Sequence, residues 1–489
     1  MSVIRSLHRL LQKGEFSPQE LAAYFLSAAE RENPGLNAYL HVCEETAKKQ
    51  AKKAQQQFTD SSAGELTGIP VALKDNLCIQ GMPATCGSRM LEHFSPVYDA
   101  AVWEQLEAQG AVLLGKTNMD EFAMGSSTET SFFGPVQNPR NRALSPGGSS
   151  GGSAAVVAAG LAVGALGSDT GGSVRQPAAF CGITGLKPTY GAVSRWGLIA
   201  YASSLDQVGP MALCAEDTAL LLDSISAKDC RDDTSRGLLL TAGSLREPVA
   251  GKRAAILKEM LEGAEPAVIK AVEDTARRLR SLGVEVTEVS IPFLQYTAPA
   301  YYIIACAEAS SNLARYDGLR YGYRSEAPAK SFHEFVCRNR QEGFGEEVRR
   351  RILMGAYVLS AGHHEQYYQR AKQIQANLRE ELEKALEQVD FLLSPVCPKA
   401  DFGAGETIQD PVTAYQADVC TAAANLSGLP AISIPSAVWK NGHPVGVQLM
   451  GKSFADGELL RLAYQLETTG TRPPYPETIQ ALLNGKEEF

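Results

Sequence analysis

The sequence predicts an α/β fold in which helices cover a β-sheet within one large domain. Two observations lead to this prediction. Short apolar runs with strand character alternate with longer segments of helical periodicity along most of the 489 residues. The chain also lacks internal repeats, low-complexity tracts and clear linkers. One continuous unit is therefore favoured over the roughly three domains that the length alone would allow.

Residues 1–65 are predicted to form a helical segment that packs on the main domain, residues 66–489. Apolar residues between Val3 and Gln57 recur at the spacing of one helix face. Ser17 followed by Pro18 is typical of a helix start, because Ser caps the free N–H groups and Pro fits the first turn.

Helices and strands then alternate along the main domain. The predicted strands are 66–73, 111–114, 254–257, 284–289, 391–393, 431–434 and 445–449. The predicted helices are 101–109, 266–282, 371–388 and 458–468. Between the early and late elements, residues 135–210 are dense in glycine, which marks a loop-rich functional centre.

Composition excludes several classes of protein. Hydrophobic residues make up 44% and charged residues 21%, as in ordinary globular proteins. A net charge of −9 argues against nucleic-acid binding by this chain alone, because phosphate binding requires clustered Lys and Arg.

The weakly polar run Ala154–Gly167 is shorter than the about 20 residues that span a bilayer. Charged residues interrupt the N-terminal apolar pattern, unlike in a signal peptide. We expect a cytoplasmic protein without membrane contact.

Three familiar site patterns are rejected. The ten cysteines contain no C-x-x-C pair, so neither a disulfide framework nor a metal site is expected. Gly110–Thr117 fits the letters of a phosphate-binding loop, but its apolar centre has strand character and cannot fold around a phosphate. Gly147–Gly151 fits the nucleophile elbow G-x-S-x-G, but a loop rather than a strand precedes it. None of the seven histidines lies in a catalytic motif.

Two Gly-Ser turns, Gly147–Ser153 and Gly167–Ser173, stand out in the glycine-rich centre. A helix over 151–162 would span roughly 18 Å. A following strand of about five residues would bring the chain back by roughly 17 Å toward the start of the helix. If the two run antiparallel, the turns meet and Ser149 lies near Ser173.

The second turn has a chemical use. Successive backbone N–H groups in a Gly-rich turn before a helix form an anion-binding nest. Thr170–Ser173 precedes a segment that could start a helix, so the turn could serve as an oxyanion hole for acyl transfer. A phosphate site or a purely structural loop fits the same letters.

A serine nucleophile without His requires another base, and Lys74 is the candidate. It ends a predicted buried strand, and burial lowers the pKa of a lysine. Lowering that pKa from about 10.4 to near 7 costs roughly 4–5 kcal/mol of solvation. The simpler alternative is an ordinary strand-end lysine beside Asp75.

Three motifs together resemble the amidase signature family: Gly147–Ala155, Gly167–Arg175 and Gly185–Gly191. The resemblance implies a single α/β/α domain with a large mixed sheet. It also implies a Ser–cis-Ser–Lys triad. Ser173 would be the acyl-ester nucleophile, Ser149 the bridging serine at a non-proline cis peptide, and Lys74 the base. The backbone N–H groups of Thr170, Gly171, Gly172 and Ser173 would form the oxyanion hole.

Further motifs resemble, within that family, the glutamine-hydrolysing subunits of tRNA-dependent amidotransferases. They are Gly115–Gly125, Glu308–Gly318 and Arg350–Gly355. The resemblance implies that ammonia from glutamine passes to a partner, the B subunit, which uses ATP and Mg to convert Glu-tRNA(Gln) to Gln-tRNA(Gln). It implies that a small C subunit is the third member of the complex, that tRNA is held mainly by the B subunit, and that this chain has no cofactor.

The same resemblance implies a binding site for glutamine. Arg351 would hold the α-carboxylate, Asp418 the α-ammonium, and Tyr302 would add a polar contact, with the neighbouring Tyr301 left as an alternative. An Arg and an acidic residue suit a zwitterion, because each charge then meets its opposite. A stand-alone amidase that acts on another small amide is the second interpretation.

Overall fold

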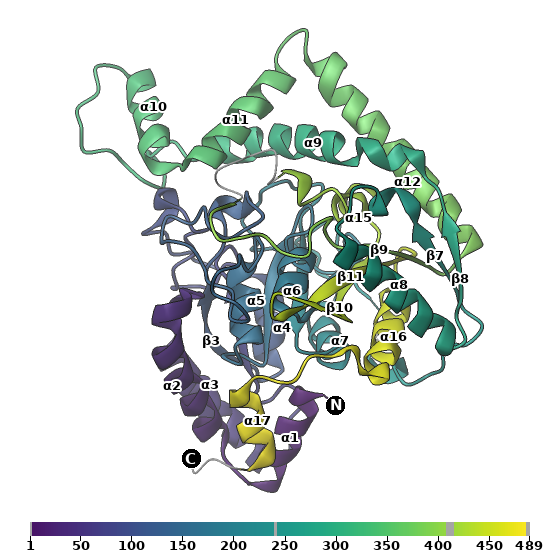
Figure 1. The fold of residues 1–489 in the computed structure, drawn as a ribbon. Helices are drawn as coiled ribbons and strands as arrows, with labels where there is room; N and C mark the ends of the chain where they lie inside the picture. Colours follow the sequence, from purple (N-terminus) through teal and green to yellow (C-terminus); the bar gives the residue numbers. More distant parts are fainter. Residues whose placement is uncertain (1, 239–241, 407–414, 486–489) are drawn as a thin grey trace.

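The computed structural model describes residues 2–238, 242–406 and 415–485. Its described strands form one eleven-stranded mixed sheet (Figure 1). In spatial order they are β1 (Tyr39–Val42), β3 (Val112–Thr117), β2 (Pro70–Lys74), β4 (Gly164–Asp169), β6 (Gln207–Ala212), β5 (Thr184–Lys187), β10 (Ala431–Lys440), β11 (His443–Gly451), β9 (Phe391–Pro395), β7 (Arg253–Leu257) and β8 (Glu285–Val289). The pairs β3–β2, β2–β4, β9–β7 and β7–β8 are parallel, and the others are antiparallel.

Helices of the described chain pack around this sheet. They are α1 (Val3–Lys13), α2 (Pro18–Leu36), α3 (Glu44–Thr59), α4 (Ala101–Ala108), α5 (Gly151–Ala158), α6 (Arg175–Cys181), α7 (Ala215–Ile225), α8 (Pro266–Ser281), α9 (Thr297–Asn312), α10 (Phe332–Gly343), α11 (Glu346–Leu359), α12 (Arg370–Gln388), α15 (Ala422–Ser427), α16 (Asp456–Leu466) and α17 (Glu477–Asn484). In Figure 1, α9, α11 and α12 form a layer above the sheet, while α8 and α16 lie below it.

Alternate residues of the sheet enter two different cores. In β7, Ala254 and Ile256 join the core that contains residues of α8 and α16. Ala255 and Leu257 join the core that contains residues of α9 and α12. Successive strand side chains point to opposite faces, so helices cover both faces of the sheet. The predicted α/β/α architecture with a mixed sheet is confirmed.

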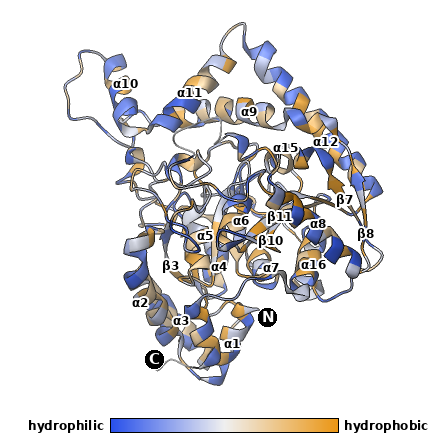
Figure 2. Cartoon of the chain, viewed as in Figure 1, coloured by the Kyte–Doolittle hydropathy of each residue, from blue (hydrophilic) through white to orange (hydrophobic). Residues whose placement is uncertain are grey.

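The N-terminal helices begin as their sequence predicts. Ser17 Oγ accepts from Glu20 N at 3.1 Å, and Glu20 accepts in return from Ser17 N at 2.7 Å, with Pro18 in the first turn. Val3 and Leu7 of α1 belong to the same core as the central strands. In Figure 2 the outward faces of α2, α8 and α12 carry many hydrophilic residues. Among the described helices, none combines the length and the apolar character that a membrane span requires.

Before residue 75, two local predictions differ from the structure. A short strand, β1, interrupts the segment between Val3 and Gln57 that the periodicity predicts to be helical. It pairs with β3 at Gly115, where a Cβ would lie only 2.4 Å from the carbonyl oxygen of His41, so glycine makes this close pairing possible. The strand expected from Leu66 begins only at Pro70, because Gly68 adopts a left-handed turn with φ of 78°.

The rejection of the phosphate-binding loop agrees with the structure. Residues Val112–Thr117 form the buried strand β3. The side chain of Lys116 is buried and forms an ion pair with Asp75 at 3.1 Å. The lysine that such a loop would direct at a phosphate is therefore a structural partner inside the domain.

Candidate active site

Lys74 lies at the end of the buried parallel strand β2. Its side chain is fully buried, and Nζ contacts three hydroxyl oxygens: Ser149 Oγ at 2.7 Å, Ser150 Oγ at 2.8 Å and Ser168 Oγ at 3.0 Å. The neighbouring Asp75 forms its ion pair with Lys116, at 3.1 Å, and none of these three contacts of Lys74 involves it.

The surroundings of Lys74 suit an amine that can lose its proton near neutral pH. Burial lowers its pKa to about 7, although the carboxylates of Asp120, Asp169 and Asp206 act in the opposite direction. The described residues place no carboxylate oxygen in an ion pair with Nζ. Hydroxyl groups solvate the amine without fixing its charge.

The two Gly-Ser turns meet. Ser150 N donates to the carbonyl oxygen of Ser173 at 3.1 Å, which places Ser149 and Ser173 on adjoining segments. The peptide bond between Gly148 and Ser149 is cis, the geometry that the family resemblance implies. The helix between the turns ends at Ala158 rather than at residue 162, and β4 then returns the chain.

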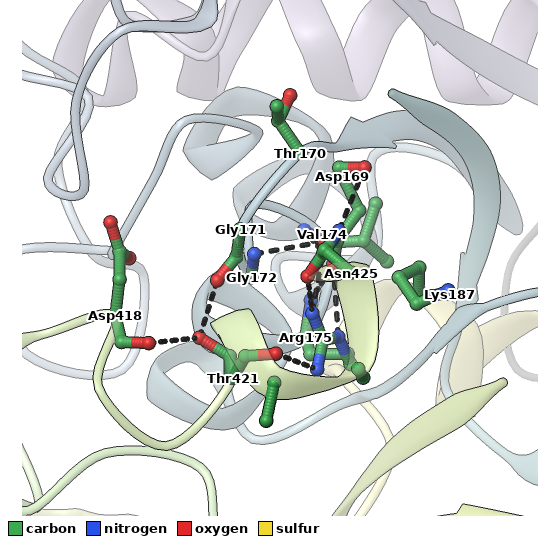
Figure 3. A network of polar contacts seen from close by, with 12 residues as sticks. Asp169, Thr170, Gly171, Gly172, Val174, Arg175, Lys187, Asp418, Thr421 and Asn425 are labelled. Atoms are coloured by element: carbon green, nitrogen blue, oxygen red, sulfur yellow. Dashed lines mark hydrogen bonds and ion pairs between the residues drawn. The ribbon is translucent and has the colours of Figure 1, made fainter. Parts of the chain in front are cut away.

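Asp169, at the end of β4, organises the second turn. Its two carboxylate oxygens accept from Gly172 N at 2.8 Å and from Val174 N at 3.1 Å (Figure 3). Within the described residues, the N–H groups of Thr170, Gly171 and Ser173 have no hydrogen-bond acceptor. Of the four expected oxyanion donors, three are therefore free, and Gly172 N is already bonded inside the turn.

A buried ion pair supports this turn from below. Arg175 contacts Asp169 at 3.0 Å and donates to Asn425 Oδ1 at 2.6 Å and Thr421 O at 2.9 Å. Burial alone would raise the pKa of Asp169, but Arg175 and Asn425 lower it to about 2. Thr421 Oγ1 also donates to Gly171 O at 2.6 Å, so α15 and its leading residue fix the turn from the C-terminal half (Figure 3).

The predicted glutamine-binding residues converge from three elements. Tyr302 comes from α9, Arg351 from α11, and Asp418 from the segment before α15. Tyr302 OH donates to Asp418 Oδ2 at 2.7 Å, and Cζ of Arg351 lies 5.3 Å from the centre of the Tyr302 ring. Burial raises the pKa of Asp418 to about 7, against the opposing effects of Tyr302 and Arg351.

Tyr301 and Tyr302 have different neighbours. Tyr301 lies directly over the turn Thr170–Ser173, where a Cβ at Gly171 would be only 2.4 Å from its Cζ. Tyr302 instead contacts Asp418. The adjacent tyrosines of α9 therefore connect Asp418 to the turn that carries Ser173.

Sequence reasoning missed several residues that shape the site. Asp206 accepts from Thr170 Oγ1 at 2.7 Å, and Tyr201 OH accepts from Arg351 at 2.8 Å. Burial raises the pKa of Asp206 to about 6. Neither residue belongs to a Gly-Ser turn. The spacing of Glu347 and Arg351, four residues apart in a helix, is a signal that could have identified the partner of Arg351.

Comparison with known proteins agrees with this geometry. A model of the amidase family matches residues 20–460. The A subunit of glutamyl-tRNA(Gln) amidotransferase from Thioalkalivibrio sulfidiphilus is 51% identical, over 95% of this chain and 96% of the relative. The protein of the same name from Methylococcus capsulatus is 49% identical, over 94% of each chain.

Solved structures show the same fold. The crystal structure of the A subunit of glutamyl-tRNA(Gln) amidotransferase from Thermotoga maritima has a TM-score of 0.79 and 41% identity, over 94% of this chain and 95% of that one. The native peptide amidase from Stenotrophomonas maltophilia has a TM-score of 0.81 and 29% identity, over 97% and 98%. The chain thus belongs to the amidase family, alongside the A subunits of glutamyl-tRNA(Gln) amidotransferases.

Proposed function

We propose that this chain is the glutaminase subunit of a tRNA-dependent amidotransferase and hydrolyses glutamine through Ser173, Ser149 and Lys74. The observation that carries the proposal is the buried Lys74 amine, which lies 2.7 Å from Ser149 Oγ and has a pKa lowered to about 7 by burial. A base of this kind can act without histidine. The names of the near full-length relatives support the choice of substrate.

Acylation begins when Ser173 Oγ attacks the side-chain amide carbon of glutamine. The proton of Ser173 passes to Ser149, and the proton of Ser149 passes to the neutral Lys74 amine. The amide oxygen gains negative charge, which the free N–H groups of Thr170, Gly171 and Ser173 stabilise. The C–N bond then breaks, the departing nitrogen takes a proton that Lys74 returns through Ser149, and ammonia leaves a glutamyl ester on Ser173.

Deacylation repeats these steps with water. Water attacks the ester carbon while its proton passes through Ser149 to Lys74. The ester bond breaks, Ser173 regains its proton, and glutamate leaves. Protons can move both ways along the hydrogen bond between Lys74 and Ser149, because the neutral amine accepts the Ser149 proton and the protonated amine donates it back.

Glutamine is recognised by two charged side chains, Arg351 and Asp418. Arg351 binds the α-carboxylate, and Asp418, oriented by Tyr302 at 2.7 Å, binds the α-ammonium. An incoming ammonium favours the ionised form of Asp418 and so lowers its pKa from about 7. Each charge of the zwitterion then meets an opposite charge, which limits the cost of burying it.

The partners follow from the same proposal. Ammonia passes to the B subunit, which holds ATP, Mg and most of the tRNA contact, and the small C subunit is the third member of the complex. The site in this chain needs no cofactor for amide hydrolysis. The complex works in the cytoplasm, where aminoacyl-tRNA is made.

A stand-alone amidase is the second candidate, supported by the similarity to the peptide amidase fold. Co-expression with candidate B and C subunits separates the two. The proposal expects the chain to co-purify with both and to release glutamate and ammonia faster when Glu-tRNA(Gln) and ATP are present. A chain that purifies alone and hydrolyses simple amides as well as glutamine would support the stand-alone amidase.

A further inference from the structure

We propose that Glu347 is a positioning residue that fixes the guanidinium of Arg351 so that only its two Nη groups meet the α-carboxylate of the substrate. The inference rests on the proposed function, since it assigns a role to the residue that orients the proposed carboxylate-binding arginine. It concerns the specificity of binding rather than the bond-breaking step.

The guanidinium of Arg351 is held on two sides. Nε donates to Glu347 Oε1 at 2.8 Å, and Nη1 donates to Tyr201 OH at 2.8 Å. Three aromatic rings surround Cζ, at 5.7 Å for Tyr201, 5.3 Å for Tyr302 and 5.8 Å for Tyr415. The side chain of Arg351 is only 4% exposed. A planar cation in such an aromatic box has few orientations open to it.

These contacts decide which edge of the guanidinium remains for a ligand. A carboxylate can meet an arginine side-on, through Nε and one Nη, or end-on, through both Nη groups. Glu347 occupies the Nε–H, so the side-on geometry is closed. Among the described residues, Nη2 has no hydrogen-bond partner, and Nη1 keeps a second N–H. The N–H groups left for a substrate carboxylate are therefore both of those on Nη2 and one on Nη1.

Glu347 is itself held in place. Its Oε1 also accepts from Tyr415 OH at 3.3 Å, and its Oε2 accepts from Arg350. The side chain is 14% exposed, so the ion pair is largely shielded from water. Glu347 also balances the buried charge of Arg351 while the site is empty.

The same helix offers a matched control. Glu346 and Arg350 form an ion pair with the same four-residue spacing, at 2.9 Å, but Glu346 is 81% exposed and contacts no predicted substrate-binding residue. If the pair of Glu347 and Arg351 only stabilised the helix, the two glutamates would behave alike. A positioning role predicts that they differ in substrate binding.

The test compares Glu347→Ala, Glu347→Gln and Glu346→Ala in the complete complex, with steady-state kinetics on two amides. Glutamine carries the α-carboxylate, and 4-aminobutanamide is the same molecule without it. We expect Glu347→Ala to raise KM for glutamine at least tenfold with kcat within threefold, and to leave KM for 4-aminobutanamide within twofold. Glu347→Gln keeps an acceptor for Nε, so its KM for glutamine should lie within threefold of the value for the unmodified protein. Glu346→Ala should match the unmodified protein.

Three results would overturn the proposal: a KM for glutamine within threefold in Glu347→Ala, equal losses on both amides, or no recovery in Glu347→Gln. If Glu347→Ala does not fold, Glu347→Asp replaces it, because it keeps the charge but withdraws the carboxylate from Nε and should raise KM equally. Activity of the unmodified complex on glutamine tests the proposed function separately. A complex without that activity refutes the function, whereas the ratios between variants test only Glu347.

Discussion

At the scale of one residue, the proposed chemistry depends most on Lys74, because burial lowers the pKa of its amine. The amine is surrounded by serine oxygens, and burial brings its pKa to about 7. A base must be neutral to accept a proton, and the neutral fraction grows as pH rises through the pKa. Glutamine hydrolysis should therefore depend on the ionisation of this amine.

We predict that kcat/KM for glutamine rises with pH through about 7 and levels off above it, because this quantity reports ionisations of the free protein. Lys74→Arg should lose roughly a thousandfold or more in kcat at every pH, because a guanidinium stays protonated and cannot accept a proton from Ser149. The measurement is kcat and kcat/KM from about pH 5.5 to 9 for both proteins. An active arginine variant, or a profile that is flat across this range, would mean that Lys74 is not the base.

Asp418 is expected to affect binding rather than chemistry, because it is proposed to contact the α-ammonium. Asp418→Asn should raise KM for glutamine about ten- to a hundredfold with a smaller change in kcat, as expected for the loss of a charge-assisted hydrogen bond of roughly 1.5–3 kcal/mol. In the unmodified protein, KM should fall as pH rises through about 7, where the carboxyl ionises.

The control for Asp418 is glutaramic acid, which is glutamine without the α-amino group. Its kinetics should barely change in Asp418→Asn, since there is no ammonium to lose. Similar losses on both substrates would show that Asp418 does not recognise the ammonium, and the stand-alone amidase would gain support.

At the scale of elements, the site depends on the close approach of α9 to the turn after β4. Gly171 lies beneath Tyr301, and a Cβ there would come within 2.4 Å of the ring. Gly171→Ala should therefore displace the turn or the ring, lower kcat for glutamine at least tenfold, and destabilise the fold by about 1–3 kcal/mol, as overpacking does.

Gly64 provides the control for this change, because a Cβ there meets nothing within 4 Å. Gly64→Ala should leave kcat and the unfolding midpoint unchanged. The measurements are glutaminase kinetics and urea unfolding of both variants. If Gly171→Ala were as active and as stable as Gly64→Ala, the turn would not need the tight contact with Tyr301.

The sequence predicts elements best where periodicity is long or composition is extreme. The helix expected at 266–282 is observed as Pro266–Ser281, and the strand expected at 254–257 as Arg253–Leu257. The sequence predicts an element poorly where contacts between distant segments determine whether that element forms. The strand β1 exists because Gly115 lets His41 approach, which no local pattern reveals.

The same distinction applies to the site. The Gly-Ser turns predict that Ser149 and Ser173 lie on adjoining segments, and the structure brings them together. The partners of Lys74 beyond Ser149, and the support of Thr170 by Asp206, depend on side-chain placement across segments far apart in the sequence. Spacing along one segment carries no information about such contacts.

At the scale of the whole molecule, the site residues come from separate parts of the chain that the fold brings together. Lys74 ends the early strand β2, and the turn Thr170–Ser173 follows the early strand β4, while α9 and α11 bring Tyr302 and Arg351 from the helical layer above. Asp418 and Thr421 come from the C-terminal half and meet Tyr302 and Gly171. The residues proposed to bind glutamine and those proposed to hydrolyse it thus come from different elements of one domain.

The central claim, that Ser173 is the nucleophile of a glutaminase serving a tRNA amidotransferase, is tested most directly by Ser173→Ala in the complex reconstituted with its B and C subunits. The measurement is Gln-tRNA(Gln) formation from Glu-tRNA(Gln) and ATP, with glutamine or with ammonium as the nitrogen source. We predict no formation with glutamine and normal formation with ammonium, because only the source of ammonia is lost. Activity with glutamine within tenfold of the unmodified complex would contradict the claim, as would the absence of rescue by ammonium.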